Sequence, residues 1–257
     1  MAPFGASRAG LMSVAEDDIP DSVAENQEIH WRYDEGDGTE VADHEDTHNL
    51  DADFTGITWN DSAGLDGWHG VLDGVDDYAN LGSDGRSALG KFTDGGEATF
   101  TAWIKPASNT SAGCFFGKNR SSNIAGLRCQ YGPDQGDNEL SWIHSDGDGT
   151  ATILTEDVGD LTDEWVFYAL VLDGDFNMDG YYAIADGDYT VTSGDSSSIG
   201  SNTEDEWGDD PHIGASRPDD FDNVEWDGGI DDMRLIGAEI SQSDLQEFVD
   251  KTKGNYE

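Results

Sequence analysis

Three carboxylates fall on one predicted hairpin in residues 67–82, which read GWHGVLDGVDDYANLG. Apolar residues on both sides predict two strands, and Asp73, Asp76 and Asp77 lie between them. Ca²⁺ in proteins takes about six to eight oxygen ligands, mainly from carboxylates and carbonyl groups. The three side chains could therefore hold a metal ion, or they could be the ordinary surface of a protein that is acidic throughout.

Asp231 is a further candidate ligand, in the predicted strand GGIDDMRL. Strand alternation places Asp231 on the same face as Met233 and Leu235, which we expect to point into the core, and sends Arg234 to the opposite face. A buried carboxylate is costly unless it is paired, and the chain has only 12 Lys and Arg residues. We therefore predict that Asp231 binds a cation, Ca²⁺. The alternative is that it accepts backbone N–H groups at the start of the strand.

The stretch DFNMDGYYAIAD matches the spacing of a calcium-binding loop, D-x-N-x-D-G with an acid at the twelfth position, here Asp186. It gives a second set of candidate calcium ligands: Asp175, Asn177 and Asp179. Its flanks read as strands, however, and Asp is so frequent in this chain that chance matches to the pattern are expected.

Catalytic motifs give little support for an enzyme. The sequence has no G-x-S-x-G, and no strand presents the paired carboxylates, about 5 Å apart, that a retaining glycosidase needs. HEDTH, residues 44–48, matches the letters of H-E-x-x-H, whose two histidines would face one metal ion on a helix. His44 and His48 stand four residues apart in HEDTH, but the surrounding residues are polar, so we interpret this segment as a solvated loop. We predict that the protein is not an enzyme.

Aromatic residues and cysteines supply the remaining candidates. Four aromatic residues lie in or beside polar segments and could stack on sugar rings, although Trp more often fills a core: Trp142, Tyr181, Trp207 and Trp226. Cys114 and Cys129 flank a predicted hairpin, where they could form a cross-strand disulfide if their Cα atoms come within about 7 Å. The alternative is two buried free thiols.

Short apolar runs separated by Gly, Asp, Asn and Ser clusters predict an all-β fold, a sandwich or a barrel. The clearest strands are residues 98–105, 165–172, 181–185 and 230–236. Residues 165–172 (WVFYALVL) are apolar on both faces, which predicts a central strand covered on both sides. A capped helix is predicted from Ser241 to Gly254. We expect residues 1–25 to form an N-terminal arm and residues 26–257 to form one domain.

The charge restricts the partners. The 257 residues include 56 Asp and Glu against 12 Lys and Arg, a net charge of -44. Molar salt shortens the Debye length to about 3 Å and screens the self-repulsion, so we interpret the acidity as a halophilic adaptation. Nucleic acids and anionic membranes would be repelled. No run approaches the roughly 20 apolar residues of a membrane span, and the N-terminus does not read as a signal peptide.

Four stretches, in order, resemble the laminin-G-like, concanavalin A-like jelly-roll family: VLDGVDDYANLG, FTAWIKP, EWVFYALVLDGD and GGIDDMRLIGAEISQSDLQEF. The resemblance covers residues 65–254. It implies a jelly-roll sandwich of two antiparallel sheets and a mostly non-catalytic domain that binds glycans or proteins. It also implies a structural Ca²⁺ ion, at which Asp73 or the Gly74 carbonyl would join Asp231.

From these features we predict a non-catalytic, lectin-like recognition module on the particle of a halophilic virus, made in a high-salt cytoplasm without a signal peptide. A tail, turret or capsid decoration would contact host glycans, dock on other virion proteins through the arm, and form a homo-oligomer. The alternatives are a purely architectural virion protein without a glycan site, and a domain of a secreted halophilic adhesin or glycosidase.

Overall fold

The computed structural model describes most of the chain. The described residues are 19–45, 47–64, 67–90, 96–109, 113–117, 126–132, 138–145, 151–185, 188–199, 210–216 and 224–256. Trp207 and Asp186, both singled out above, and residues 1–18 of the expected arm lie outside these ranges.

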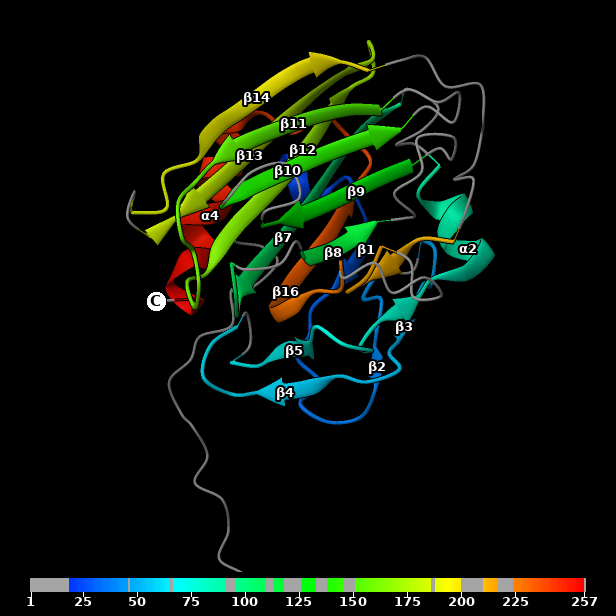
Figure 1. Ribbon diagram of the computed structural model, residues 1–257. Helices are drawn as coiled ribbons and strands as arrows, with labels where there is room; N and C mark the ends of the chain where they lie inside the picture. The colour runs from blue at the N-terminus through cyan, green and yellow to red at the C-terminus, as the bar shows by residue number, and fades with distance from the viewer. Residues whose placement is uncertain are drawn as a thin grey trace, which may run out of the picture.

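Two antiparallel sheets make up the domain (Figure 1). The larger sheet runs, in spatial order, through β14 (Thr192–Ser198), β13 (Asn177–Ile184), β12 (Val166–Asp173), β7 (Glu97–Pro106), β16 (Asp227–Ile236), β5 (His69–Asp73) and β4 (Thr58–Asn60), with β1 (Gln27–Trp31) also paired to β16. The smaller sheet runs through β11 (Ala151–Asp157), β10 (Glu139–Ser145), β9 (Gly126–Tyr131), β8 (Gly113–Gly117), β15 (His212–Ile213) and β6 (Ala79–Asn80).

Short elements complete the described fold. Strands β2 (Glu40–Val41) and β3 (Ala52–Asp53) pair in a small third sheet. The helices are α1 (Asp21–Ala24), α2 (Gly82–Ala88) and α4 (Gln242–Thr252), and α4 is followed by the 3-10 helix η3 (Lys253–Asn255). No helix in the described ranges is long and apolar enough to cross a membrane. The all-β sandwich with a C-terminal helix is confirmed.

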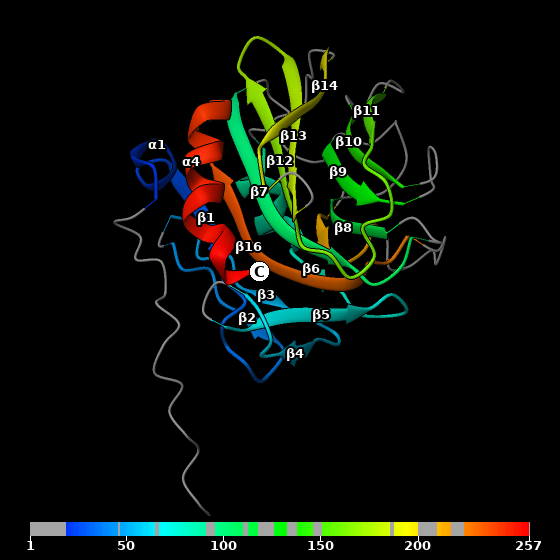
Figure 2. The same cartoon turned by 90° about the vertical axis from the view of Figure 1, so that its left-hand side faces the viewer.

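The central strands β12, β7 and β16 of the larger sheet are buried on both faces, because one face meets the smaller sheet and the other meets α4 (Figure 2). Strand β12 is apolar throughout because both of its faces pack into hydrophobic clusters. Tyr168 and Leu170 pack into the cluster between the sheets, whereas Phe167 and Ala169 pack into the cluster under α4. This confirms the prediction of a central strand covered on both sides.

The C-terminal helix begins where the sequence predicts. The Ser241 hydroxyl accepts a hydrogen bond from the Asp244 backbone N–H at 3.2 Å, which satisfies one of the free donors of the first turn. Leu245, Phe248 and Val249 are buried against the sheet. The helix ends at Thr252, two residues before the predicted Gly254.

The boundary of the arm needs a correction. Ile19 and Val23 are buried in the cluster under α4, and the Ser22 hydroxyl donates to the Asp244 carboxylate at 2.8 Å. Residues 19–25 therefore belong to the domain, because their apolar side chains are part of its core.

A bulge in β16 overturns the predicted orientation of Asp231. The pairing with β7 shifts register between Asp231 and Arg234, and Asp232 has φ 45°, a left-handed conformation. Met233 still packs between the sheets. Asp231 faces the other way, because its carboxylate meets Tyr256 at the C-terminal end of the chain. The prediction that Asp231 shares a face with Met233 is wrong: strict alternation does not hold across a bulge.

The bulge also buries a charged cluster under α4. Asp232 Oδ1 lies 2.8 Å from His30 Nε2 and 2.8 Å from Arg234 Nε, and all three side chains are almost fully buried. The Arg234 guanidinium also lies over the Phe248 ring, 5.0 Å from its centroid. Arg234 and His30 hold the pKa of Asp232 at about 2 despite its burial, and burial together with the Arg234 charge lowers the pKa of His30 to about 3. At neutral pH the cluster is therefore an Asp⁻–Arg⁺ pair with a neutral histidine.

Removing the buried carboxylate should destabilise the fold severely. We expect Asp232→Ala to lower the free energy of unfolding by about 3–5 kcal/mol, because Arg234 would be left as an uncompensated buried charge. The matched control is Asp250→Ala, which removes the same charge from an exposed pair with Lys253 and should cost about 0–1 kcal/mol. Urea denaturation at one high salt concentration measures both values, and similar losses for the two variants would contradict this account.

The net charge of -44 predicts that the fold depends on salt. We expect the native circular dichroism spectrum in molar KCl and its loss as KCl falls, because the Debye length grows from about 3 Å at 1 M to about 10 Å at 0.1 M and the carboxylates then repel one another. A native spectrum that is unchanged at 50 mM KCl would contradict this prediction.

Candidate functional site

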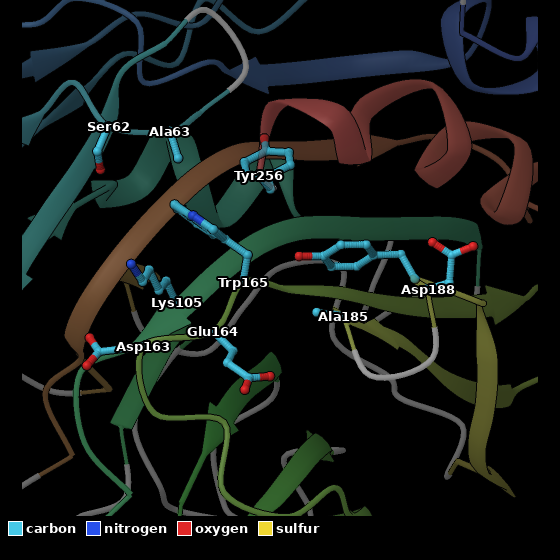
Figure 3. Close-up of a pocket in the computed structure, with 10 residues that line it drawn as sticks. Ser62, Ala63, Lys105, Asp163, Glu164, Trp165, Ala185, Asp188 and Tyr256 are labelled. Carbon is cyan, nitrogen blue, oxygen red and sulfur yellow. The ribbon is translucent and has the colours of Figure 1, made fainter.

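A cleft of about 580 Å³ opens on the outer side of the larger sheet, near the C-terminal end of the chain (Figure 3). Segments far apart in the sequence meet there. Lys105 comes from the end of β7, and Asp163, Glu164 and Trp165 come from the turn that leads into β12. Tyr256 follows η3, while the connections β4–β5 and β13–β14 supply the rest of the lining: Ser62, Ala63, Ala185, Asp188 and Tyr189.

Aromatic rings form the base of the cleft. The Tyr256 ring stacks on Trp103, with ring centroids 4.1 Å apart, and is tilted against Trp165 at 5.0 Å. Tyr189 meets Trp103 edge-on at 5.3 Å. The Trp165 indole N–H makes no hydrogen bond within the described part of the chain. Trp165 and Tyr256 are each only 4% exposed. The rings support one another, so the small apolar surface that they offer under the polar opening is rigid.

Asp231 fixes the position of Tyr256. The Tyr256 hydroxyl donates to Asp231 Oδ2 at 2.9 Å, deep inside the protein. Burial, and then the Asp231 charge, raise the pKa of Tyr256 well above its usual value, so the hydroxyl remains a donor. A Cβ atom on Gly64 would lie 3.0 Å from Asp231 Oδ2 and only 1.7 Å from the Trp68 carbonyl oxygen. Glycine is therefore required where this loop packs over Asp231.

Charged groups surround the opening. Figure 3 shows Lys105 and Asp163 on one side of Trp165 and Asp188 on the other. Asp188 is held by Lys253, whose Nζ lies 3.2 Å from its carbonyl oxygen and 3.7 Å from its carboxylate. Among the described residues, the side chains of Lys105, Asp163 and Glu164 make no hydrogen bond or ion pair with each other or with neighbours. They are therefore available to a bound molecule.

Chemically, the cleft combines an apolar ring surface with acceptors and a donor at its rim. Carboxylates accept hydrogen bonds from hydroxyl groups, and an ammonium group donates to them. Aromatic faces contact the C–H faces of a sugar ring. This set of groups suits a neutral, polyhydroxylated ring.

A model of one protein family matches residues 73–246, about two thirds of the chain, under the description concanavalin A-like lectin/glucanases superfamily, Laminin_G_3. The chain belongs to this family. The resemblance found in the sequence is thereby confirmed. No curated protein matches the sequence significantly.

Solved structures share the fold of this concanavalin A-like chain. The botulinum neurotoxin serotype D binding domain superposes with a TM-score of 0.61 at 14% identity, over 91% of this chain and 53% of the toxin chain. Domain 4 of an extracellular arabinanase from Geobacillus stearothermophilus, in complex with arabinotriose, superposes with 0.59 at 16% identity, over 88% and 98%. The serotype D domain in complex with N-acetylneuraminic acid gives 0.60 at 13%, over 91% and 52%. This chain spans about half of the toxin domains, and identities this low show the fold alone.

The opening hairpin brings its carboxylates together but keeps them apart from Asp231. Asp73, Asp76 and Asp77 each offer an oxygen within 4.8 Å of the other two, a donor set that suits Ca²⁺. Asp73 Oδ1 already accepts the Val75 N–H, and Asp77 Oδ2 accepts the Asp73 N–H. Burial raises the pKa of Asp77, and the charges of its two neighbours add to this.

The register of the sheet corrects the predicted shared calcium site. Asp73 pairs with Asp227, four residues and about 13 Å along the strand from Asp231. Asp231 therefore cannot share one ion with Asp73 or with the Gly74 carbonyl. Gly74 itself is needed by the turn, because it has φ 70° and a Cβ there would lie 2.7 Å from the Asp227 Cβ. Calcium binding by any of these residues stays a prediction.

The second predicted calcium loop is organised by a residue that the pattern did not include. Asp173 accepts the backbone N–H groups of Asp175 and Asn177 and, through Oδ2, the Asn177 side-chain amide. Asp173, Asn177 and Asp179 line a shallow polar hollow with Ser196–Ser198, and Asp175 does not. Burial, and then the Asp173 charge, raise the pKa of Asp179. Gly180 packs against Trp142, where a Cβ would lie 2.5 Å from the indole, so packing explains the D-G pair.

The predicted sugar-stacking aromatic residues are mostly in the core. Trp142 is fully buried, donates to the Ala169 carbonyl at 2.7 Å and stacks on Tyr168. Trp226 is 1% exposed and donates to the Gly229 carbonyl. Neither side chain can reach a sugar, so the core alternative holds for both. Tyr181 lies half-buried beside the cluster under α4 and does not line the cleft.

The structure shows two free, buried thiols. Phe116, and not Cys114, is the strand partner of Cys129, because a bulge in β8 shifts the register after Cys114. Of the two alternatives that the sequence left open, this geometry supports the buried free thiols over the cross-strand disulfide. Burial raises the pKa of the Cys129 thiol far above its usual value, so it carries no nucleophilic thiolate.

The sequence did not single out the residues of the cleft. Trp165 falls in the stretch that predicts a covered central strand, and the structure does bury it, 4% exposed, although it also lines the cleft. Tyr256 lies beyond the predicted helix. One clue was available: a tryptophan next to the acidic pair Asp163–Glu164 marks the point where an apolar strand meets a polar turn.

We predict that neither thiol of the native protein reacts with a thiol-specific reagent, because both are buried. Two thiols per chain should react after unfolding, without added reductant, and reductant should leave the melting temperature unchanged. Recovery of no thiol from protein unfolded without reductant would contradict the free-thiol structure.

Proposed function

We propose that this chain is a non-catalytic carbohydrate-binding module whose ligand occupies the cleft over Trp165 and Tyr256. The observation that carries the proposal is the combination of a rigid aromatic base with hydrogen-bonding groups at the rim that have no partner among the described residues. Membership of a lectin and glucanase superfamily supports it. So do two structures of the same fold, one in complex with arabinotriose and the other with N-acetylneuraminic acid.

In this proposal the rings provide affinity and the rim provides orientation. A sugar ring lies over the small part of Trp165 and Tyr256 that reaches the cleft and removes that apolar surface from water. Hydroxyl groups donate to Asp163 and Asp188 and accept from Lys105. The acidic rim favours a neutral saccharide over an anionic one, because the three carboxylates of the lining outnumber its single ammonium group.

The setting predicted from the sequence, a halophilic virus particle that attaches to host glycans, remains part of this proposal. The net charge of -44 supports the high-salt habitat. The architectural virion protein and the secreted adhesin are the alternatives. Peptides of this chain in the proteome of purified virions would support the viral setting, and their absence from the particles would contradict it.

We predict that Trp165→Ala weakens binding to a neutral oligosaccharide at least about tenfold, because the ring forms the base of the site. Asp188→Ala should also weaken binding, and its side chain is 90% exposed, so the fold should tolerate the change. The matched control is Tyr181→Ala, an aromatic residue near the same face but outside the cleft.

A screen of neutral and acidic oligosaccharides in molar KCl identifies the ligand, and titration calorimetry then measures the variants. Circular dichroism checks that each variant is folded. Binding that survives in both cleft variants but is lost in Tyr181→Ala would place the ligand elsewhere. A wild-type protein that binds no saccharide would contradict the proposed function.

A further inference from the structure

A second cluster of chemically active side chains lies before the part of the chain that matches the family, away from the cleft. Asp34 and Glu35 follow β1, and His44 comes from the segment after β2. One nitrogen or oxygen atom from each lies within 4.8 Å of the other two. We infer that Asp34, Glu35 and His44 form a binding site for a divalent transition-metal ion such as Zn²⁺.

Backbone contacts hold the three residues in place. The His44 N–H donates to the His30 carbonyl at 2.9 Å, and Asp43 forms an isolated bridge with Trp31, so the histidine segment is tied to the end of β1. The buried Tyr33 has φ 58°, which turns the chain directly before the two acids. The three side chains therefore meet without a large rearrangement.

Glu35 is the strongest indication of a cation. Its Oε1 accepts the Ala42 N–H at 2.9 Å, which fixes the carboxylate. Its Oε2 is shielded from solvent and has no hydrogen-bond partner among the described residues. Such an oxygen loses the full hydration of a carboxylate without compensation, so it calls for a proton or a metal ion.

The spacing between His44 and Asp34 suits a bridging ion better than a direct bond. His44 Nε2 lies 3.9 Å from Asp34 Oδ1, beyond hydrogen-bonding range. Two ligands of a tetrahedral zinc ion, with bonds of about 2.0–2.2 Å, lie roughly 3.3–3.6 Å apart, so a small contraction closes the site. Arg32 Nε lies 3.3 Å from the other oxygen, Asp34 Oδ2, and thereby orients the carboxylate from outside.

The mixed donor set indicates the class of metal. Ca²⁺ and Mg²⁺ prefer sites made of oxygen alone, as in the Asp73, Asp76 and Asp77 cluster, whereas imidazole favours Zn²⁺ and its first-row neighbours. Three protein ligands leave one position of a tetrahedral zinc ion for water. Bound metal would join the end of β1 to the segment after β2, so its main effect should be on stability.

His48 provides a matched control. It stands four residues from His44 in the same segment and is also partly exposed, but its Nε2 lies 3.4 Å from Glu28 Oε2, in a separate ion pair. A metal held by the three proposed ligands depends on His44 and not on His48. Loose binding to the acidic surface depends on neither residue.

The test uses the full chain, freed of metal with a chelator and held in molar KCl. We expect calorimetric titration with ZnCl₂ to show one site per chain and the melting temperature to rise by at least about 4 °C with saturating Zn²⁺. His44→Ala and Glu35→Gln should lose both effects, and His48→Ala should keep them. CaCl₂ should give no response that depends on His44.

Several outcomes would overturn the inference. One is a wild-type protein with no saturable Zn²⁺ site. Another is a response that persists in both His44→Ala and Glu35→Gln, which would assign the binding to other carboxylates. A loss in His48→Ala equal to that in His44→Ala would assign the site to the histidine pair. Each variant is first melted without metal, so that a folding defect is distinguished from a lost ligand.

Discussion

The bulge at Asp231 and Asp232 is the local constraint on which distant parts of the molecule depend. The left-handed residue Asp232 sends two successive carboxylates to the same side of β16. Such a conformation costs about 1–3 kcal/mol in a residue other than glycine. The cost is offset because Asp232 pairs with Arg234 and with His30 of β1, while Asp231 receives the hydroxyl of Tyr256. One backbone irregularity thus ties the N-terminal strand and the C-terminal end to the centre of the sheet.

The cleft inherits its rigidity from the same bulge. The hydrogen bond to Asp231 fixes the hydroxyl of Tyr256, and the ring of Tyr256 stacks on Trp103 and meets Trp165. The β-branched and aromatic side chains of the larger sheet form the apolar surface under Tyr256. The Asp231 carboxylate then holds the Tyr256 ring in one position on that surface. A pre-organised aromatic surface loses less entropy on binding than a mobile one, which favours recognition of a small, weakly bound ligand such as a sugar.

Strands and helices with a strong local pattern were predictable from the sequence. Which distant side chains meet in the folded protein was not. The two-faced apolar run of β12 and the capped helix after Ser241 follow from periodicity and capping rules alone. A bulge inserts an extra residue into a strand and interrupts the alternation of side chains between the two faces. For this reason the predicted orientation of Asp231 and the predicted register of Cys114 with Cys129 were both wrong. Trp165 and Tyr256 are separated by most of the C-terminal part of the chain, and only the folded sheet brings them together.

In a chain with 56 acidic residues, the presence of an Asp or Glu says little about function. The group that the carboxylate contacts says much more. Asp250 is exposed and pairs with a lysine at the surface, where water would serve almost as well. Asp232 is buried and stays ionised because an arginine and a histidine surround it. Glu35 is different again, since one of its oxygens is shielded without a donor and a histidine lies nearby. Acidic side chains that adapt a surface to salt can occur anywhere on the molecule. An arginine, a histidine or a tryptophan next to a carboxylate, by contrast, requires a specific fold. Functional carboxylates in such a protein are therefore best found through its few basic and aromatic residues.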